Sequence, residues 1–367
     1  MGDHKFLYDY DMISKSSASG KIVQQVVLPI LIGAGCLWLS LRSVDLTGVT
    51  AAIRLVAWPW VGIAVLGVIL VSAGKALRWQ WLYPGNAVPL PWSIHFSTLL
   101  IGQMLNLVVP VRLGEIARLG LMAQEHRPVG MTLGTIAMEK ALDLVATGLL
   151  LLVSLPVAVF PAWLGANAGK SALIAGIALL GGLGLLAQFR ITILRVLSGL
   201  PEPRWRLLAY LWRVSLRLSV SLLEGIGGVV GRKFLPVTGL TVLIWLLSVS
   251  VIYIVLLGFG RGDLWRAAPV LSVALIFSNL APTPPALIGV VTAVTEGVLV
   301  PFGVFPSEAF AIGVILNGVL VAPLVALGGG FAGMRLLRWL ALPGQGPTRY
   351  ALGLGVADPE DDRCKKS

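Results

Sequence analysis

Two apolar stretches of this chain are each interrupted by a polar break that contains proline and glycine. The first break spans residues 106–115, and the second spans residues 279–289. Inside a bilayer, backbone groups released by proline and glycine must be covered by protein or by a water-filled cavity, because lipid offers them no hydrogen bonds. A matched pair of such interruptions, one in each half of the chain, is typical of the substrate site of a membrane transporter.

The composition indicates an integral membrane protein. Of the 367 residues, 57% are hydrophobic and only 12% are charged, whereas a soluble domain carries about 25% charged residues. The net charge of +11 comes from basic residues dispersed among apolar segments, so nucleic-acid binding is not expected. The cytoplasmic bias of Lys and Arg, or attraction to anionic lipid headgroups, accounts for this charge. Cys36 and Cys364 form no metal-binding or disulfide pattern, and no cofactor is expected.

Six segments are apolar and long enough for a full membrane crossing, which needs about 20 residues. They lie at about residues 22–41, 58–77, 130–159, 172–189, 237–257 and 309–336. The basic connection 190–235, which has the pattern of an amphipathic surface helix, belongs in the cytoplasm, as does the basic tail 341–367. The N-terminal segment 1–21 is then cytoplasmic as well.

These loop charges agree with one another only if each broken segment enters the membrane and returns on the same side. The fold class expected for the polytopic domain 22–340 is therefore all-α, with about six full transmembrane helices and two re-entrant helical hairpins. Crossing, hairpin and crossing then occur twice with opposite polarity, which is an inverted-topology repeat. The alternative replaces each hairpin by a pair of full crossings and gives about eight or more spans.

Three charged residues, Glu139, Lys140 and Asp143, lie inside one of the apolar segments. On a helix, Glu139 and Asp143 share a face one turn apart, and each ionisable group at mid-membrane costs on the order of 3 kcal/mol. We expect these residues to line a polar path and to handle a charged headgroup or a coupling proton. The alternatives are a self-neutralising Lys140–Asp143 pair, or a segment shifted so that the charges reach the interface.

Arg112, Glu115 and Arg118 follow the first break. The planar fork of a guanidinium group suits phosphate, and free backbone N–H groups near the start of a helix bind the same kind of group. These residues are therefore candidates for binding an anionic headgroup. In the alternative interpretation, both arginines are ordinary cytoplasmic-side charges and Glu115 pairs with one of them.

Asn106 and Asn279 begin the two breaks, and Glu296 stands alone in the apolar limb after the second. Each asparagine amide either binds substrate or satisfies backbone groups that proline releases. Glu296 is either a counterpart of the charges in the first half or an interfacial residue. Lys75, near the end of the second span, is explained by snorkelling of its ammonium group. The residues expected to shape the hairpins are Pro110, Gly114, Pro282, Pro284, Pro285 and Gly289.

The stretch 102–143 resembles the core signature of the lysylphosphatidylglycerol synthase transmembrane-region family. That signature has an Asn, then Pro-x-Arg-x-Gly-Glu, a nearby Arg and a later Glu-basic-x-x-Asp helix. Here these positions are filled by Asn106, Pro110, Arg112, Gly114, Glu115, Arg118, Glu139, Lys140 and Asp143. The second family signature, Pro-x-Pro-Gly-Gly-hydrophobic-Gly followed by Glu, is matched less well, because Pro285 and Ala286 replace glycines. Thr292 stands near the position of the usual Glu, one turn before Glu296.

The resemblance implies a lipid flippase or transporter of the inner membrane, a stand-alone member without the soluble aminoacyl-transfer domain of larger relatives. Its substrate would be an anionic phospholipid, a polyprenyl-phosphate-linked sugar or a hopanoid, and its partner would be a lipid-modifying enzyme. Gly328-Gly-Gly330 allows close helix contact, either within the chain or in a homodimer.

The sequence lacks the common motifs of several enzyme classes. It contains no P-loop, no histidine-rich metal motif and no serine nucleophile elbow, so no enzymatic activity is expected. Two alternatives stay open: a membrane enzyme that acts on a lipid-linked phosphate, with Glu139 and Asp143 as acid and base, and a proton-coupled carrier of a small solute.

Overall fold

Every regular element of the described chain is a helix. The computed structural model describes residues 28–42, 44–84, 89–109, 113–154, 233–278 and 284–341, with a few isolated positions between 174 and 220. The helices of the first half are α2 (Leu28–Arg42), α3 (Leu46–Arg54), α4 (Trp58–Leu82), α5 (Trp92–Val108), α6 (Gly114–Gln124) and α7 (Val129–Ser154). Those of the second half are α11 (Phe234–Gly258), η3 (Gly262–Arg266), α12 (Ala267–Ser278), η4 (Pro285–Leu287), α13 (Val290–Leu299), η5 (Val300–Phe302) and α14 (Pro306–Ala341).

Four of the described segments are long and apolar enough to cross a membrane. They are α4, most of α11, the run Pro285–Phe302 and most of α14. The pair α2 and α3, which is bent by 92°, brings the total to five if it counts as one broken span. The all-α membrane class is thus confirmed, whereas the number of crossings and the depth of the broken segments stay predictions. The predicted span 172–189 and the basic connection 190–235 lie almost entirely outside the described residues.

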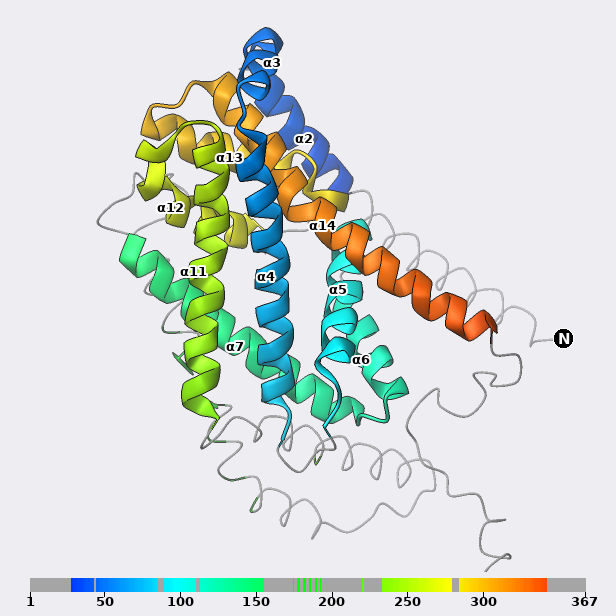
Figure 1. Cartoon of the computed structure of the whole chain (residues 1–367). Helices are drawn as coiled ribbons and strands as arrows, with labels where there is room; N and C mark the ends of the chain where they lie inside the picture. Colours follow the sequence, from blue (N-terminus) through cyan, green and yellow to red (C-terminus); the bar gives the residue numbers. More distant parts are fainter. Residues whose placement is uncertain are drawn as a thin grey trace, which may run out of the picture.

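Helices α4 and α11 form the centre of the molecule (Figure 1), where they lie side by side and α7 crosses both of them. They are antiparallel and in close contact. A Cβ atom at Gly67 would lie 2.6 Å from Cγ2 of Val251, and one at Gly74 would lie 3.0 Å from Cγ1 of Ile244. Small residues on α4 therefore bring these two helices together. Helix α14 passes them on a diagonal.

The buried core has two parts with different neighbours. One part joins α4 to α11, α12, α13 and α14 through aliphatic side chains such as Val255, Leu271 and Leu316. The other part surrounds Trp79 and joins α4 to α5, α6 and α7. The charged residues singled out above lie beside the second part, as the next section describes.

Both broken segments fold back on themselves. In the first, α5 and α6 are antiparallel: Gly102 packs against Arg118, and Asn106 packs against Gly114. In the second, α12 and α13 pack against each other across the break. The helices on either side of each break therefore pack against each other, while re-entry of these segments into a membrane stays a prediction.

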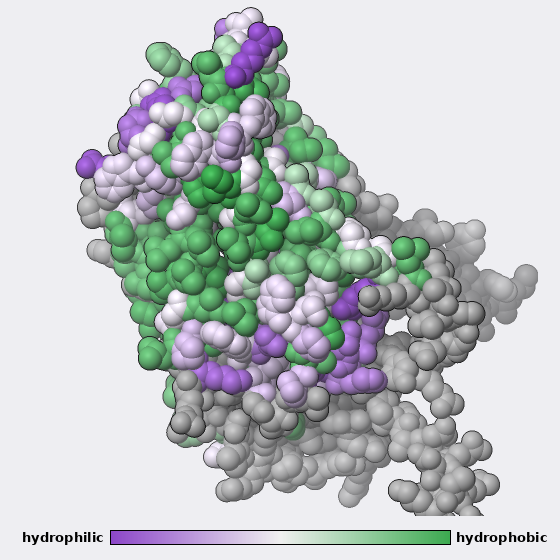
Figure 2. Space-filling model, viewed as in Figure 1, coloured by the Kyte–Doolittle hydropathy of each residue, from purple (hydrophilic) through white to green (hydrophobic). Residues whose placement is uncertain are grey.

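The outer face of α4 and α11 is apolar. Figure 2 shows this face with hydrophobic residues over its middle and hydrophilic residues near both ends. Leu66 and Leu70 of α4 are 60% and 58% exposed, and Leu246 of α11 is 60% exposed. Large exposed apolar surfaces are rare on soluble monomers, so this belt is the surface expected to meet lipid.

Candidate functional site

The charges of α7 are paired with residues of other helices. Nη2 of Arg118 lies 2.7 Å from Oε2 of Glu139. Nη1 of Arg78, on α4, lies 2.7 Å from Oδ1 of Asp143. Nζ of Lys140 lies 3.4 Å from Oε1 of Glu115. The three ion pairs tie α7 to both α4 and α6.

Two alternatives considered from the sequence are corrected by these contacts. The Lys140–Asp143 pair is replaced by pairs of each residue with a different helix. Glu115 takes Lys140 as its ion-pair partner rather than Arg118, whose guanidinium group binds Glu139. The physical reason is that both α4 and α6 pack against α7, so each charge meets a closer partner across a helix interface than along its own helix.

The first break sets the position of α6. Oδ1 of Asn106 accepts a hydrogen bond from the backbone N–H of Gly114 at 2.7 Å, and its Nδ2 donates to Oε2 of Glu115 at 3.2 Å. A Cβ atom at Gly114 would collide with the carbonyl oxygen of Gly102 and with the Asn106 side chain. The amide therefore satisfies backbone that the break exposes, and the glycine lets α6 start directly against α5.

Arg118 is held from two sides. Its guanidinium carbon lies 4.0 Å from the centre of the Trp79 ring, a distance at which a cation is attracted to the ring face. The indole N–H of Trp79 donates to Oγ1 of Thr135 at 3.0 Å, which fixes the ring. Arg118 and Glu139 are both 4% exposed. The Nε atom of Arg118 is buried and makes no hydrogen bond within the described structure.

Arg78 is the most deeply buried charge of the group, with no exposed surface. Its Nη1 donates to Asp143 and, at 3.3 Å, to Oγ1 of Thr241 on α11. Its Nε and Nη2 are buried and have no hydrogen-bond partner in the described part of the chain. A buried donor left without a partner costs about 1–3 kcal/mol, and more when it is charged. Two such donors on one guanidinium group indicate a place where a polar ligand or water binds.

Lys75 lies one turn before Arg78 and belongs to the same group. It lies within the electrostatic influence of Asp143, Glu139, Arg78 and Lys140, yet among the described residues no carboxylate lies within ion-pair distance of it. Lys75 is partly exposed, so snorkelling, the explanation given from the sequence, stays a prediction, and the structure adds that the residue lies beside these charges.

We call these seven residues the charge cluster. It is made of Lys75, Arg78, Glu115, Arg118, Glu139, Lys140 and Asp143. Four positive charges against three negative charges leave one positive charge in excess. The members of the cluster differ in exposure. Arg78 is fully buried, whereas the side chains of Lys140, Glu115 and Asp143 are 55%, 32% and 26% exposed.

Several predicted site residues do not join the cluster or cannot be placed. Arg112, Pro110, Asn279 and Pro282 lie outside the described residues. Glu296 lies on α13 beside Ser40 of α2, away from the ion pairs, and its Oε1 is buried without a hydrogen-bond partner there.

The described residues of the second break that were expected to shape a hairpin contact no member of the charge cluster. Pro284 and Pro285 lead into η4, and Gly289 has a φ of 80°. A Cβ atom at Gly289 would collide with the carbonyl oxygen of Gly33 on α2. The hydroxyl of Thr292 donates to the Gly289 carbonyl at 2.9 Å.

Sequence reasoning missed Arg78. The predicted span ended at residue 77, but α4 continues to Leu82, so Arg78 lies inside the helix rather than beyond it. An ionisable residue inside a membrane helix is a functional candidate in its own right, and the presence of Lys75 one turn earlier strengthens that signal.

Comparison with known proteins supports the resemblance found in the sequence. The family described as the lysylphosphatidylglycerol synthase TM region matches residues 26–328, which runs from the start of α2 into α14. No curated protein and no solved structure matches the chain. The family match covers far more than half of the 367 residues and includes the whole charge cluster. The chain therefore belongs to the family of lysylphosphatidylglycerol synthase transmembrane regions.

Proposed function

We propose that this protein is a lipid flippase that moves an anionic headgroup across the membrane through the charge cluster. Membership of the family supports a membrane protein that acts on lipids. The observation that carries the finer proposal is Arg78, a fully buried guanidinium group with two N–H donors left without partners. A phosphate oxygen is the acceptor that such a fork binds best.

The charge balance of the cluster favours a headgroup with one negative charge. Each carboxylate of the cluster is engaged by a cation, and one cation is left in excess. Binding a singly charged phosphodiester brings the sum to zero, and a neutral assembly loses less hydration energy inside a membrane than a charged one does. The headgroup would exchange water for the cluster while its apolar chains stay in lipid.

The ion pairs also offer a way for the headgroup to move. Lys140 and Glu115 are partly exposed and 3.4 Å apart, so their contact is weak and can open. Arg118 and Glu139 are buried and 2.7 Å apart, and Trp79 holds the guanidinium plane. A headgroup would first displace the exposed pair and then reach the buried arginines, with no covalent step. A lipid gradient or consumption of the lipid on the far side would supply the energy.

An enzymatic role for Glu139 and Asp143 finds less support. Both carboxylates are engaged by guanidinium groups at 2.7 Å, which favours their ionised form and leaves neither of them an evident proton donor. Analysis of the lipid recovered after the assay described next separates the two functions. A flippase returns its substrate chemically unchanged.

The test is translocation of fluorescent phosphatidylglycerol in proteoliposomes, followed by chemical quenching of the outer leaflet. We expect Glu139→Gln to slow translocation by about 100-fold, because it leaves the buried Arg118 without a counter-charge, at about 3 kcal/mol. The matched control is Glu308→Gln, the same change in a carboxylate that pairs with Arg261 at 3.0 Å near the start of α14. The control should translocate at the parental rate. If Glu139→Gln is as fast as the parent and equally folded, the proposal is wrong.

A further inference from the structure

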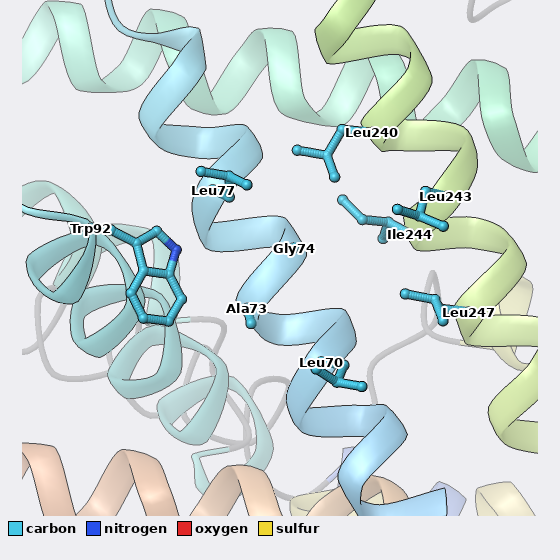
Figure 3. A pocket seen from close by; sticks show the side chains of 9 residues that line it. All are labelled: Leu70, Ala73, Gly74, Leu77, Trp92, Leu240, Leu243, Ile244 and Leu247. Carbon is cyan, nitrogen blue, oxygen red and sulfur yellow. The ribbon is translucent and has the colours of Figure 1, made fainter.

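A groove runs along the outer face of α4 and α11. It has a volume of about 430 Å³ and is lined by apolar residues alone, and this volume lies within the range of about 300–1,000 Å³ that is usual for ligand sites. Figure 3 shows Leu70, Gly74 and Leu77 of α4 along its length, with Trp92 of α5 on one side and leucines of α11 on the other. The groove thus joins three helices, and the indole nitrogen of Trp92 is the one polar side-chain atom among the residues that line it.

The shape of the groove suits an extended hydrocarbon chain. Its floor is shallow where Gly74 contacts Ile244, and its rims are formed by larger side chains. Leu70 and Leu243 are 58% and 50% exposed, so the groove is open on the side that meets lipid. An open, almost wholly apolar groove on a membrane-facing surface offers a chain more contact area than a smooth helix pair does.

At one end of the groove, the lining residues Leu77 of α4 and Leu240 of α11 directly precede Arg78 and Thr241 in the chain. Lys75 follows Gly74, and Arg78 lies one turn after Gly74 on the same side of α4. On α11, Thr241 follows the groove residue Leu240 and accepts the hydrogen bond from Arg78. The Arg78–Thr241 hydrogen bond and the Gly74–Ile244 contact thus lie about one helical turn apart along the same α4–α11 interface.

We infer that this groove, which we call the chain groove, binds one hydrocarbon chain of an anionic phospholipid whose phosphate binds Lys75 and Arg78. The inference rests on the proposed function and adds to it a lateral entry site between α4 and α11. It also assigns Lys75 as the residue that selects the charge of the lipid. A zwitterionic lipid would bring a second cation, and the carboxylates of the cluster are already engaged by Arg78, Arg118 and Lys140.

The test is photo-labelling of the full chain in phosphatidylcholine vesicles. The probe is phosphatidylglycerol with a diazirine in one acyl chain, and the labelled peptides are mapped by mass spectrometry. We expect labels on the groove residues of α4 and α11, and we expect labelling to saturate at a low fraction of probe. Phosphatidylcholine with the same diazirine chain should label these helices weakly and in proportion to its amount.

Two matched pairs of variants separate binding from structure. Lys75→Gln should reduce saturable labelling by about fivefold, the usual effect of one basic residue on binding to anionic lipid, whereas Lys75→Arg should keep it. Ala73→Trp fills the chain groove and should remove the labels. Leu66→Trp adds bulk on the same helix outside the groove and should leave them unchanged.

Two results would overturn the inference: equal labelling by both headgroups, or labelling that survives both Lys75→Gln and Ala73→Trp. The outcome is distinct from that of the transport test. If labelling behaves as expected but Glu139→Gln still translocates lipid at the parental rate, the flippase proposal fails and the chain groove remains. If Glu139→Gln stops translocation and labelling is not saturable, only the chain groove is wrong.

Discussion

The two breaks of this chain have similar backbone contacts, but the side chains around them differ in charge. At the first, Gly114 starts α6 against the carbonyl of Gly102, and at the second, Gly289 brings α13 against the carbonyl of Gly33. In both, a nearby side chain bonds the backbone that the break exposes: Asn106 accepts from Gly114, and Thr292 donates to Gly289. If both breaks lie inside the membrane, as the sequence predicts, the need to cover their backbone explains why they share these contacts.

The surroundings of the breaks are unlike. Near the first break, two ion pairs join α6 to α7 and a third joins α4 to α7, through Arg78, whose Nε and Nη2 have no hydrogen-bond partner in the described structure. Around the second break, α13 buries aliphatic side chains such as Val291, Val298 and Leu299, and Glu296 has no ion pair in the described structure. Under the proposed function, the region around the first break binds the headgroup and the region around the second provides packing.

The largest expected effect comes from breaking a buried pair at the first break. Arg78→Met should lower the free energy of unfolding by about 3 kcal/mol, because the Asp143 carboxylate loses its counter-charge. Adding Asp143→Leu to Arg78→Met should restore most of the loss, since no charge is then left without a partner. Glu296→Gln, at the second break, should change stability by less than about 0.5 kcal/mol. Denaturant unfolding of the protein in detergent micelles, followed by circular dichroism, measures all three.

Either of two results would contradict the claim that the Arg78–Asp143 pair contributes more to stability than Glu296 does. One is an Arg78→Met protein that is as stable as Glu296→Gln. The other is a double variant that is no more stable than Arg78→Met alone, which would show that Arg78 stabilises the fold through contacts other than its pair with Asp143.

Replacing either of the two break glycines should lower stability by the same amount, and by less than Arg78→Met does. Gly114→Ala and Gly289→Ala should each cost about 2 kcal/mol, because each new methyl group meets a backbone carbonyl that cannot move aside. Gly120→Ala on α6 and Gly297→Ala on α13 are the controls, since a Cβ atom at either position meets nothing within 4 Å. They should be neutral or stabilising, because alanine favours a helix over glycine.

The same unfolding measurement checks this prediction. A loss confined to one of the two break glycines would mean that the breaks do not share a backbone solution. Losses of the same size at Gly120 and Gly297 would mean that the effect belongs to helical glycines in general and not to the breaks.

The sequence predicted the features that are local. Residues 139, 140 and 143 are conspicuous because charge is rare in apolar helices, and both breaks are marked by proline and glycine. At both places the two flanking helices pack against each other. The family signature across residues 102–143 led to the family that the comparison confirmed.

The ion-pair partners could not be predicted in the same way. They depend on how α4, α6 and α7 meet, and no spacing within one helix contains that information. Arg78 was not predicted as a site residue for a more specific reason. The apolar run that defined the predicted span ends at Leu77, whereas α4 continues through Arg78 and Trp79 to Leu82. A long polar side chain can lie inside a helix that continues past the apolar run, provided that neighbouring helices supply partners.

The measurement that tests the account most directly is the headgroup preference of translocation. Parental protein and the folded Arg78→Met/Asp143→Leu double variant are reconstituted side by side, and each is given fluorescent phosphatidylglycerol or phosphatidylcholine with identical chains. The account predicts that the parent moves the anionic probe faster and that the double variant loses this preference. A double variant that still prefers the anionic probe by the parental ratio would contradict the assignment of headgroup binding to Arg78 and the charge cluster.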